Sequence, residues 1–550
     1  MNRRIAPVLA IAFLAGSLVF GLVAHLTNPV LPEDDAYITY RYVDNLLNGK
    51  GLVYNPGQRV FGSSTPLYVA WLAGIRSVAR LVPTPDLAVR ANFVFYALTI
   101  VGICFLLTSL GTSVGTAALL AGLVSFRVSL LRASLGGMET FLFAGLLVWS
   151  LWTLVTRRFR LGAWLAGLSA LARPEGVLMV VLFFASWLIE RRHCPTGAAA
   201  ADWREIIGLL LPGLAWVAFA TPYFGTPIYH SILAKSRPLY PLRPGSALAT
   251  LTNWLVLWMV GGTTLWPAGA LTAVLLLVAV VLVVAALGYV RLLTPSPRGD
   301  VEPAAKVLLV PVLLAMFTFF YAVSNPLLFS WYLPPVELLW FASIATGVAL
   351  AVGWLKGRGD ARLTLVPVLG LVVLTSGPAL MPLYKSLAAH RPLADLRLAS
   401  DRNLARTMTY RETAEWLNRV APCGDTLIAP EIGALGYYYH GFIYDACGLV
   451  SPEALPFLPV PDSERTGSTV GAISLGLVRH LRCDVVVTMQ GFASRSLYPS
   501  AWYHENYELV KQFKLPIQFW GPGGDTIDVF FRRDCRALRD LRDSAATPDR

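Results

Sequence analysis

The residues best suited to chemistry in this 550-residue chain are three consecutive carboxylates, Glu33, Asp34 and Asp35, which follow directly after its first long apolar segment. Adjacent carboxylates repel one another, so we expect at least one raised pKa unless a cation or a divalent metal lies near. A carboxylate beside a membrane is suited to act as a general base toward a sugar hydroxyl. The alternative is structural: Asp34 or Asp35 would cap the helix that "AYITYRYVDNLL" predicts and accept hydrogen bonds from its first amides. The residues alone leave both interpretations open.

A second set of polar residues lies at the ends of other apolar segments, and its members suit the binding of a phosphate or a sugar. Arginine and lysine there would stabilise an anionic phosphate as it leaves, although the same side chains also reach lipid headgroups. Glutamate would hydrogen-bond a sugar hydroxyl or pair with an arginine, and Glu175 follows Arg173 so closely that a structural salt bridge is favoured. Tyrosine and histidine at this depth also suit the aromatic belt of a membrane interface. The candidates are Arg59, Glu139, Arg173, His230, Lys235, Arg237 and Tyr332.

The chain that must position these residues is too apolar for a soluble enzyme. Hydrophobic residues make up 55% of it and charged residues 14%, with a mean hydropathy of +0.58, whereas charged residues supply about a quarter of soluble globular domains. Apolar stretches long enough to cross a ~30 Å hydrocarbon layer recur from residue 5 to about 380 and then stop. We therefore predict a polytopic α-helical membrane domain over residues 1–384 and a soluble domain over 385–550. After a retained first span, ten further spans are expected at 88–109, 115–132, 139–156, 160–173, 176–190, 206–223, 268–290, 306–323, 332–354 and 363–380.

The basic surplus belongs to the membrane domain alone, which holds 26 Lys and Arg against 14 Asp and Glu, while the tail holds 19 of each. No basic aromatic groove or recognition motif accompanies this charge, which argues against nucleic acid. The segment "STPLYVAWLAGIRSVARLV" (63–82) decides the topology, because Arg76 and Arg80 interrupt it. If it lies in the interface, the cytoplasmic side carries more basic residues, as the positive-inside rule requires. We therefore expect a cytoplasmic N-terminus, and an outer loop at 28–87 on the same side as the tail.

The tail is predicted to be an α/β domain, because helical patterns alternate with strand-like runs such as "DTLIA", "FIYDACG" and "CDVVVTM". Four of the six cysteines lie in it, an even number that favours two disulfides in an oxidising compartment, although buried thiols would have the same spacing. The candidates are Cys423, Cys447, Cys483 and Cys535.

An ordered set of motifs resembles a known family. "DDAYITYRY", "NGKGLVYNPGQRVFGSSTPLY", "GGMETFLFAGLL", "ALARPEG", "YFGTPIYHSILAKS", "FSWYLPP" and "EIGALGYYYHGFIYDACGLVSPE" occur in that order between about residues 33 and 453. Together they resemble bacterial membrane glycosyltransferases of the GT-C superfamily, and most of all the terminal arabinofuranosyltransferases of actinobacterial cell envelopes. The segment "GTPIYHSILAKS" departs from the family, whose members more often carry an Asn-Thr pair before Ala-Lys, so His230 and Ser231 put the substrate contacts there in question.

The resemblance implies an inverting enzyme of the bacterial inner membrane that takes a sugar from a polyprenyl-phosphate donor on the outer face. The acceptor would be an envelope glycan, a glycolipid or a protein. It also implies that an acid of the first outer loop is the base, which falls on Asp34 or Asp35. We favour Asp34, with Asp35 orienting the acceptor or binding a cation. Mg²⁺ or Mn²⁺ would suit these carboxylates beside a phosphate, and the nearby basic side chains would supply the same charge without a metal.

Two other classes of function are left open. A transporter or flippase for lipids or sugars would place charged residues or broken helices near the mid-plane and often shows an inverted repeat. No such repeat is visible in the sequence. A non-catalytic envelope scaffold would use the tail to bind a partner, and it would be indifferent to the loss of the acidic pair.

Overall fold

The fold is that of a computed structural model, and it divides the chain into two compact units. One, the helical unit, combines Met1–Asn28, Val89–Ala215 and Pro244–Leu393; the other, the loop–tail unit, combines Pro29–Ala88, Trp216–Arg243 and Ala394–Arg550. The structure describes residues 5–27, 32–193, 202–237, 242–260, 268–293, 302–357, 370, 372, 402–421, 425–466, 472–515 and 524–546.

The helical unit consists of long apolar helices, as the sequence predicts. Nine of the ten spans expected after the first coincide with helices, the segment 115–132 as a pair, and the tenth, 363–380, falls almost wholly outside the described residues. The helices are α1 (Ile5–Thr27), α4 (Thr84–Ser109), α5 (Val114–Ser125), α6 (Val128–Leu135), α7 (Thr140–Val155), α8 (Phe159–Ala172), α9 (Val177–His193), α10 (Trp203–Phe224), α12 (Ser246–Val260), α13 (Ala268–Leu293), α14 (Glu302–Ser324) and α15 (Leu333–Gly357), with short 3₁₀ turns η1 (Pro174–Gly176) and η3 (Ser330–Tyr332).

Length and composition separate these helices into classes. Within the described residues, six helices are long and apolar enough to cross a membrane, and a seventh span results if α5 and α6, which meet at a 64° bend, count as one. Helices α7 and α8 are apolar but shorter. The chain is thus a multi-pass membrane protein, while the predicted number of eleven spans is not confirmed.

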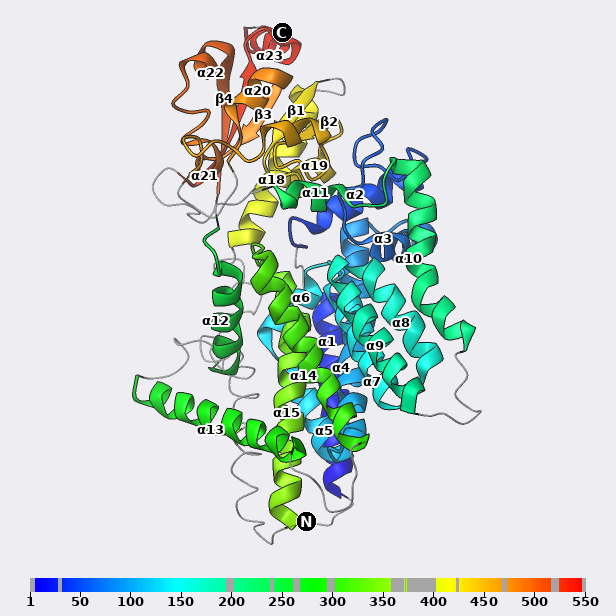
Figure 1. The fold of residues 1–550 in the computed structure, drawn as a ribbon. Coiled ribbons are helices and arrows are strands. Elements are labelled where there is room, and N and C mark those ends of the chain that lie inside the picture. The colour runs from blue at the N-terminus through cyan, green and yellow to red at the C-terminus, as the bar shows by residue number, and fades with distance from the viewer. Residues whose placement is uncertain are drawn as a thin grey trace. The chain divides into compact units, whose positions relative to one another are not determined.

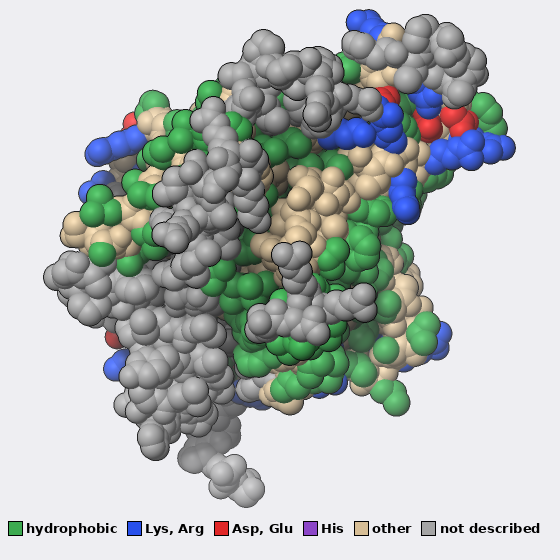
Figure 2. Space-filling view, turned by 90° about the horizontal axis from the view of Figure 1, so that it is seen from below, with side chains coloured by type: hydrophobic (Ala, Val, Ile, Leu, Met, Phe, Trp, Pro, Cys, Tyr) green, Lys and Arg blue, Asp and Glu red, His purple; other side chains and the backbone are tan. Residues whose placement is uncertain are grey.

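Burial in the helical unit follows from the apolar composition. Helix α7 lies beside α8 and α15, and every one of its residues except Trp149 is buried (Figure 1). Helices α13 and α15 cross closely because Gly288 faces Gly347, where an added side chain would overlap backbone, a device common between membrane helices. Large apolar side chains remain exposed elsewhere, such as Phe319 and Val323 on α14. Figure 2 shows one such face, on which hydrophobic side chains cover a broad area, as expected of helices that contact lipid.

The loop–tail unit joins the first loop to the tail. Its helices in the loop are α2 (Ala36–Leu47) and α3 (Pro66–Val78). With 13 residues, α3 is about 20 Å long and too short to cross a ~30 Å layer, which agrees with the interfacial interpretation of residues 63–82. The remaining elements are α11 (His230–Ser236), α18 (Arg402–Val420), β1 (Thr426–Ala429), α19 (Ala434–Tyr438), β2 (Phe442–Asp445), η5 (Pro452–Phe457), α20 (Leu475–Leu481), β3 (Val485–Thr488), α21 (Gln490–Ala493), α22 (Ala501–Asn506), β4 (Tyr507–Lys514), β5 (Thr526–Arg532) and α23 (Arg536–Ala546).

The tail contains a five-stranded sheet in the order β2-β1-β3-β5-β4, which confirms the predicted α/β domain (Figure 1). Strands β2, β1 and β3 are parallel, as alternating strands and helices predict, whereas β5 and β4 are antiparallel additions that the sequence analysis did not identify. The two faces are covered by different helices: Trp416 of α18 packs against Phe531, while Leu477 of α20 joins the cluster around Phe530.

Two expectations change. Residues 29–88, which we assigned to the membrane domain, group with the tail, because side chains of this loop bond the tail at many points.

Among the described residues Cys447, Cys483 and Cys535 are free thiols. Two disulfides among four cysteines would need at least one bridge within these three, so the two predicted disulfides do not form; Cys423 itself lies outside the described residues. The three thiols are buried in the tail instead, and Cys447 donates to the carbonyl of Pro430.

Candidate active site

The acidic pair lies in the loop–tail unit, and Asp34 is held by a turn of the tail 400 residues further along the chain. Its Oδ1 accepts a hydrogen bond from the amide of Ala434 at 2.9 Å, and the side chain is 6% exposed. The contact requires a glycine before Ala434, because a Cβ on Gly433 would overlap the carbonyl and carboxylate oxygens of Asp34. Burial raises the pKa of Asp34, while Arg406 and the amides of Ala434 and Gly433 oppose the rise.

The helix-cap interpretation of the pair is wrong. Asp35 occupies the N-cap position of α2, yet its side chain makes no capping hydrogen bond. The first amides of α2 bond backbone carbonyls instead, Ala36 to Glu33, Tyr37 to Asp34 and Ile38 to Asp35. The carboxylate of Asp34 satisfies an amide of α19, a helix of the tail, and not of the helix it precedes. Neither carboxylate therefore caps the N-terminus of α2, and helix capping does not explain their presence.

Asp35 differs from its neighbour because its side chain is half-buried. Burial raises the pKa of Asp35, the charge of Asp34 raises it further, and Lys235 and Arg406 lower it. The structure thus places Lys235, an exposed residue of α11, within electrostatic reach of the pair. The repulsion expected between adjacent carboxylates is present, and two cations moderate it.

Arg406 belongs to an ion pair inside the tail. Its Nη1 lies 2.5 Å from Oε1 of Glu431, whose Oε2 accepts a hydrogen bond from the hydroxyl of Tyr410 at 2.8 Å. Burial raises the pKa of Glu431 to about 7, and the charges of Asp34 and Asp35 add to the rise, while Arg406 and Tyr410 oppose it. Three carboxylates and two cations therefore act on one another around the acidic pair.

Helix α2 is fixed against the tail by a buried arginine. The guanidinium of Arg41 donates to backbone carbonyls at Tyr54 (2.8 Å), at Gly441 (3.0 Å) and at Gly436, and it lies 4.6 Å from the centre of the Tyr54 ring. Asn55 bonds both the carbonyl and the amide of Ile443 in β2, which extends the sheet edge by a side chain. These contacts determine where α2 begins and hence where the acidic pair lies.

The other loop candidates lie in the same unit, with contacts of their own. The guanidinium of Arg59 is exposed and lies 4.8 Å from the centre of the Tyr223 ring. His230 is half-buried, with Nδ1 3.0 Å from the carbonyl of Gly448, and burial lowers its pKa. Arg237 is exposed at the C-terminus of α11. Within the described contacts, Lys235 alone of the predicted phosphate ligands interacts with the pair.

The remaining candidates form a separate cluster in the helical unit. Arg173 lies between two glutamates, with Nη1 3.6 Å from Oε1 of Glu139 and Nη2 3.5 Å from Oε1 of Glu175. Its Nη1 also donates to the carbonyl of Trp331 at 3.0 Å, and its guanidinium lies 4.4 Å from the centre of the Tyr332 ring. The three charged side chains are at most 8% exposed. The expected salt bridge between Arg173 and Glu175 is confirmed, and Glu139 joins it; we name this set the Arg173 cluster.

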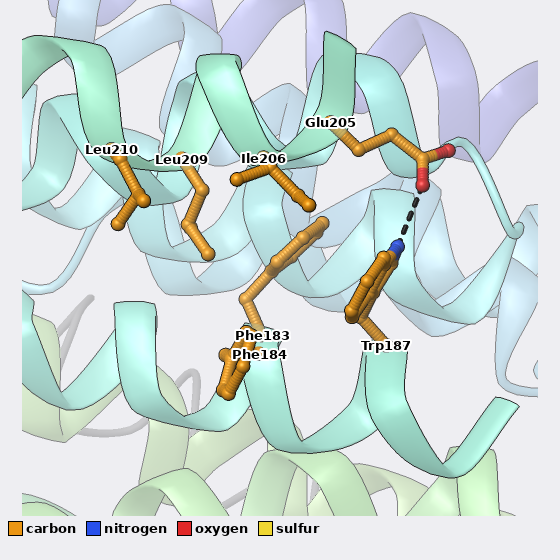
Figure 3. A pocket seen from close by; sticks show the side chains of 7 residues that line it. All are labelled: Phe183, Phe184, Trp187, Glu205, Ile206, Leu209 and Leu210. Atoms are coloured by element: carbon orange, nitrogen blue, oxygen red, sulfur yellow. Dashed lines mark hydrogen bonds between the residues drawn. The ribbon is translucent and has the colours of Figure 1, made fainter. Parts of the chain in front are cut away.

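A pocket elsewhere in the helical unit is almost entirely apolar. It is a partly open pocket of about 40 Å³ between α9 and α10, lined by Phe183, Phe184, Trp187, Glu205, Ile206, Leu209 and Leu210 (Figure 3). Its one acid, Glu205, accepts from the indole of Trp187 and pairs with Arg191, both at 2.6 Å. None of the candidate residues lines it.

The expectation that Mg²⁺ or Mn²⁺ binds at the acidic pair stays a prediction, because one or two carboxylates can hold such an ion together with a substrate phosphate. Across the part of the chain that the structure describes, no three His, Cys, Asp or Glu side chains converge as ligands. One oxygen of Asp34 is engaged by an amide, and Lys235 and Arg406 already supply positive charge to the pair. No step of the reaction below is therefore assigned to Mg²⁺ or Mn²⁺.

Three residues of the site were missed from the sequence. Glu431 and Gly433 stand in the segment "EIGALGYYYHGFIYDACGLVSPE", which contributes to the family resemblance but does not by itself indicate a partner for the acids. Arg406 lies in none of the motifs that carry the resemblance. A signal existed for Glu431 alone, as an acid in a glycine-rich turn directly after a buried strand.

Solved structures with the same architecture exist. An oligosaccharyltransferase from Archaeoglobus fulgidus, in complex with zinc and sulfate, is 12% identical with a TM-score of 0.52, over 94% of this chain and 72% of that chain. ArnT from Cupriavidus metallidurans in its apo state is also 12% identical with a TM-score of 0.52, over 94% of this chain and 97% of that chain. This chain has the GT-C fold. The GT-C resemblance noted in the sequence is thereby confirmed at the level of the fold.

One further solved structure and one family model also match the chain. The arabinofuranosyltransferase AftD from Mycobacteria is 16% identical with a TM-score of 0.49, and the match covers 97% of this chain but 40% of that chain. A family model described as a domain of unknown function, DUF8728, matches residues 400–531. No curated protein matches the sequence.

Proposed function

We propose that this GT-C protein is a membrane glycosyltransferase that moves a sugar from a polyprenyl-phosphate donor to a hydroxyl group of a glycan, glycolipid or protein of the cell envelope. The observation that carries the proposal is the acidic pair, held beside Lys235 and Arg406 in a turn whose glycine admits Asp34. A lipid-linked donor is supported by ArnT, whose structure has been solved with undecaprenyl phosphate bound. That structure matches this chain with a TM-score of 0.50. An arabinofuranosyl donor follows from the sequence resemblance.

The proposed reaction is a direct displacement. The acceptor oxygen attacks the anomeric carbon while a carboxylate takes its proton, so that one carbon–oxygen bond forms as the bond to phosphate breaks. The polyprenyl phosphate leaves with the bonding electron pair, and the configuration at the anomeric carbon inverts. No covalent sugar intermediate is needed, and general-base assistance of this kind contributes about 10²- to 10⁴-fold.

The contacts favour Asp35 as the base, although the sequence favoured Asp34. A base must reach the acceptor proton, and the half-buried side chain of Asp35 makes no capping bond. Asp34 is 6% exposed and is engaged by the amide of Ala434. In this assignment Asp34 helps to position Asp35, and the negative charge of Asp34 contributes to the raised pKa of Asp35.

Lys235 is the proposed cation for the departing phosphate, because it is exposed and acts on Asp35. Arg237, two residues further on and also exposed, is proposed to assist it. Arg59, which lies over Tyr223, is a weaker candidate. Arg173 already contacts two carboxylates, a carbonyl and an aromatic ring, so we propose that it stabilises the fold together with Glu139 and Tyr332. We propose the same structural role for His230, which lies against the carbonyl of Gly448.

The proposed place of work is the outer face of the bacterial inner membrane, with the N-terminus in the cytoplasm. Membrane-impermeant labelling of a cysteine introduced at exposed Lys50, in intact cells, tests this side. Labelling of that cysteine only after the cells are lysed would contradict the topology.

The activity itself is tested with radiolabelled polyprenyl-phosphate sugars, pentofuranose and hexose, supplied to the purified protein with envelope acceptors. One donor should be consumed by the wild-type protein and not by the double variant Asp34→Asn/Asp35→Asn. Asp44→Asn is the matched control, because Asp44 lies in α2, which the acidic pair precedes, and its carboxylate accepts hydrogen bonds from Thr84 and Tyr437. Equal turnover by the double variant and the wild type would refute the proposal, and a scaffold would be indifferent to all three changes.

A further inference from the structure

Four consecutive residues of the tail, Glu431 to Ala434, each hold part of the acidic site. Glu431 pairs with Arg406. The carbonyl of Ile432 accepts a hydrogen bond from the hydroxyl of Tyr54 at 2.6 Å. Gly433 leaves the space that Asp34 fills, and Ala434 donates its amide to Asp34. A displacement of this turn would therefore move the acidic pair with it.

The turn is itself fixed by one face of α18. Arg406 and Tyr410 are four residues apart, so both side chains lie on the same side of the helix, and each contacts a different oxygen of Glu431. The side chains of Arg406 and Glu431 are each 15% exposed. A well-buried ion pair of this kind is strongly destabilised by removal of one partner, so the geometry depends on both.

We propose that Arg406, together with Tyr410, fixes Glu431 and the turn that bonds Asp34, and is thereby the positioning residue of the acidic pair. This inference rests on the proposed function and extends it, because it makes the tail part of the active site. Arg406 acts through Asp34 and Asp35 and touches no reacting atom.

Two cations act on the acidic pair. Lys235 has the larger effect on Asp35, while Arg406 acts on both aspartates. The ionisable groups that act on the pair from neighbouring elements are Arg406 and Tyr410 of α18, Glu431 of the turn, Lys235 of α11, Asp445 of β2, Cys447 just after β2, and Tyr37 and Tyr54 of the loop. Among these groups, Arg406 and Lys235 carry the positive charge. Lys235 is exposed, where solvent and salt weaken its effect, whereas Arg406 is the cation that acts on both aspartates.

The sign of the effect follows from this arrangement. The charge of Arg406 lowers the pKa of both aspartates, so its loss would raise both pKa values. Asp35 would then stay protonated, and therefore inactive as a base, up to a higher pH. Loss of the Glu431 charge removes a neighbouring anion and leaves Arg406 for the pair, so the pKa of Asp35 would fall. A change that merely loosened the fold would not move the two variants in opposite directions.

The test measures protonation of Asp35 without any substrate. A hydrophobic carbodiimide adds only to the protonated carboxyl, and mass spectrometry of the modified peptide gives the pH at half-modification. Relative to wild type, we expect this midpoint to rise by roughly one pH unit in Arg406→Gln, to fall in Glu431→Gln, and to return toward wild type in Arg406→Lys. The control Arg411→Gln, which breaks the exposed Arg411–Glu415 pair of the same helix, should leave it unchanged.

The results separate the two proposals. Midpoints that shift as expected, in proteins that consume no donor, would support the positioning role and refute glycosyl transfer. Where a donor is consumed, the pH at half-maximal kcat/KM should shift in the same direction as the midpoint in each variant. An unchanged midpoint in Arg406→Gln, or a rise in Glu431→Gln, would overturn the positioning role whatever the activity. If Arg406→Gln does not fold, two other variants decide the matter: the midpoint of Arg406→Lys should lie near that of wild type, and the midpoint of Glu431→Gln should lie below it.

Discussion

The two ionic clusters of this protein use similar side chains in opposite ways. In the Arg173 cluster the guanidinium lies between Glu139 and Glu175 and also contacts a carbonyl and a ring, so each carboxylate has the arginine as a neighbour. In the acidic pair, Asp34 bonds a backbone amide, and Arg406, the arginine that acts on both aspartates, is itself paired with a third carboxylate. The first arrangement neutralises charge, and the second preserves it.

This difference separates a structural ion cluster from a chemical one. A buried charge without a partner costs several kcal/mol, and such a cost is commonly met at sites that need a shifted pKa. Both aspartates of the acidic pair have raised pKa values, and Asp35 is also half-buried, as a base that must meet its substrate requires. Each prediction below would weaken or sharpen this contrast.

The largest effect is expected from the acidic pair. Asp35→Asn should lower kcat by about 10²- to 10⁴-fold because it removes the base, with unchanged unfolding temperature, measured on the purified protein in detergent. Asp34→Asn should lower kcat less, since the side-chain oxygen of asparagine still accepts the hydrogen bond that the amide of Ala434 donates. If Asp34→Asn proves the more damaging of the two, the base is Asp34, as the sequence favoured.

Substitution of Arg173 should lower the stability of the protein rather than act directly on its activity. Arg173→Gln leaves Glu139 and Glu175 buried without their cation and should cost about 3–5 kcal/mol of unfolding free energy. Thermal unfolding in detergent measures this loss, with Arg411→Gln as an exposed ion-pair control. An unchanged unfolding temperature together with a raised KM for donor would mean that Arg173 binds the phosphate and that the two clusters are alike.

The close approach at Gly433 gives an intermediate effect. Gly433→Ala places a methyl group where Asp34 lies, and such overpacking costs roughly 1–3 kcal/mol. We expect lower stability and a displaced Asp34, seen as reduced turnover. Gly74→Ala in α3 is the control, because open space surrounds that position and alanine favours the helix. Full turnover in Gly433→Ala would show that the turn does not set the position of the pair.

The smallest effect is expected from exposed cations. Lys235→Gln should raise the KM for donor a few-fold, with a difference that shrinks at high salt, because exposed charges are screened. Arg59→Gln should change KM less, since its guanidinium lies over Tyr223. Steady-state kinetics at two salt concentrations compare them, and a larger KM effect in Arg59→Gln would reverse the assignment of the phosphate cation.

Much of the fold was predictable because apolar length and alternation are local properties. The spans and the strands β1, β2 and β3 follow from runs of hydrophobic residues. Strand β4 was missed, because its residues "YELVKQFK" are mostly polar and only Tyr507 and Phe513 are buried. The acidic pair was found through its type and position, whereas Arg406, Glu431 and Gly433 acquire meaning only through contacts across nearly 400 residues, which periodicity does not reveal.

The turn that receives Asp34 is synthesised 400 residues after Asp34 itself. Until the ribosome has added those residues, the amide of Ala434 and the charges of Arg406 and Glu431 do not yet exist beside the acidic pair. A nascent chain that lacks this turn therefore has both aspartates without the surroundings that shift their pKa values. On the proposed function, the base would become competent only after this part of the tail has been made and folded.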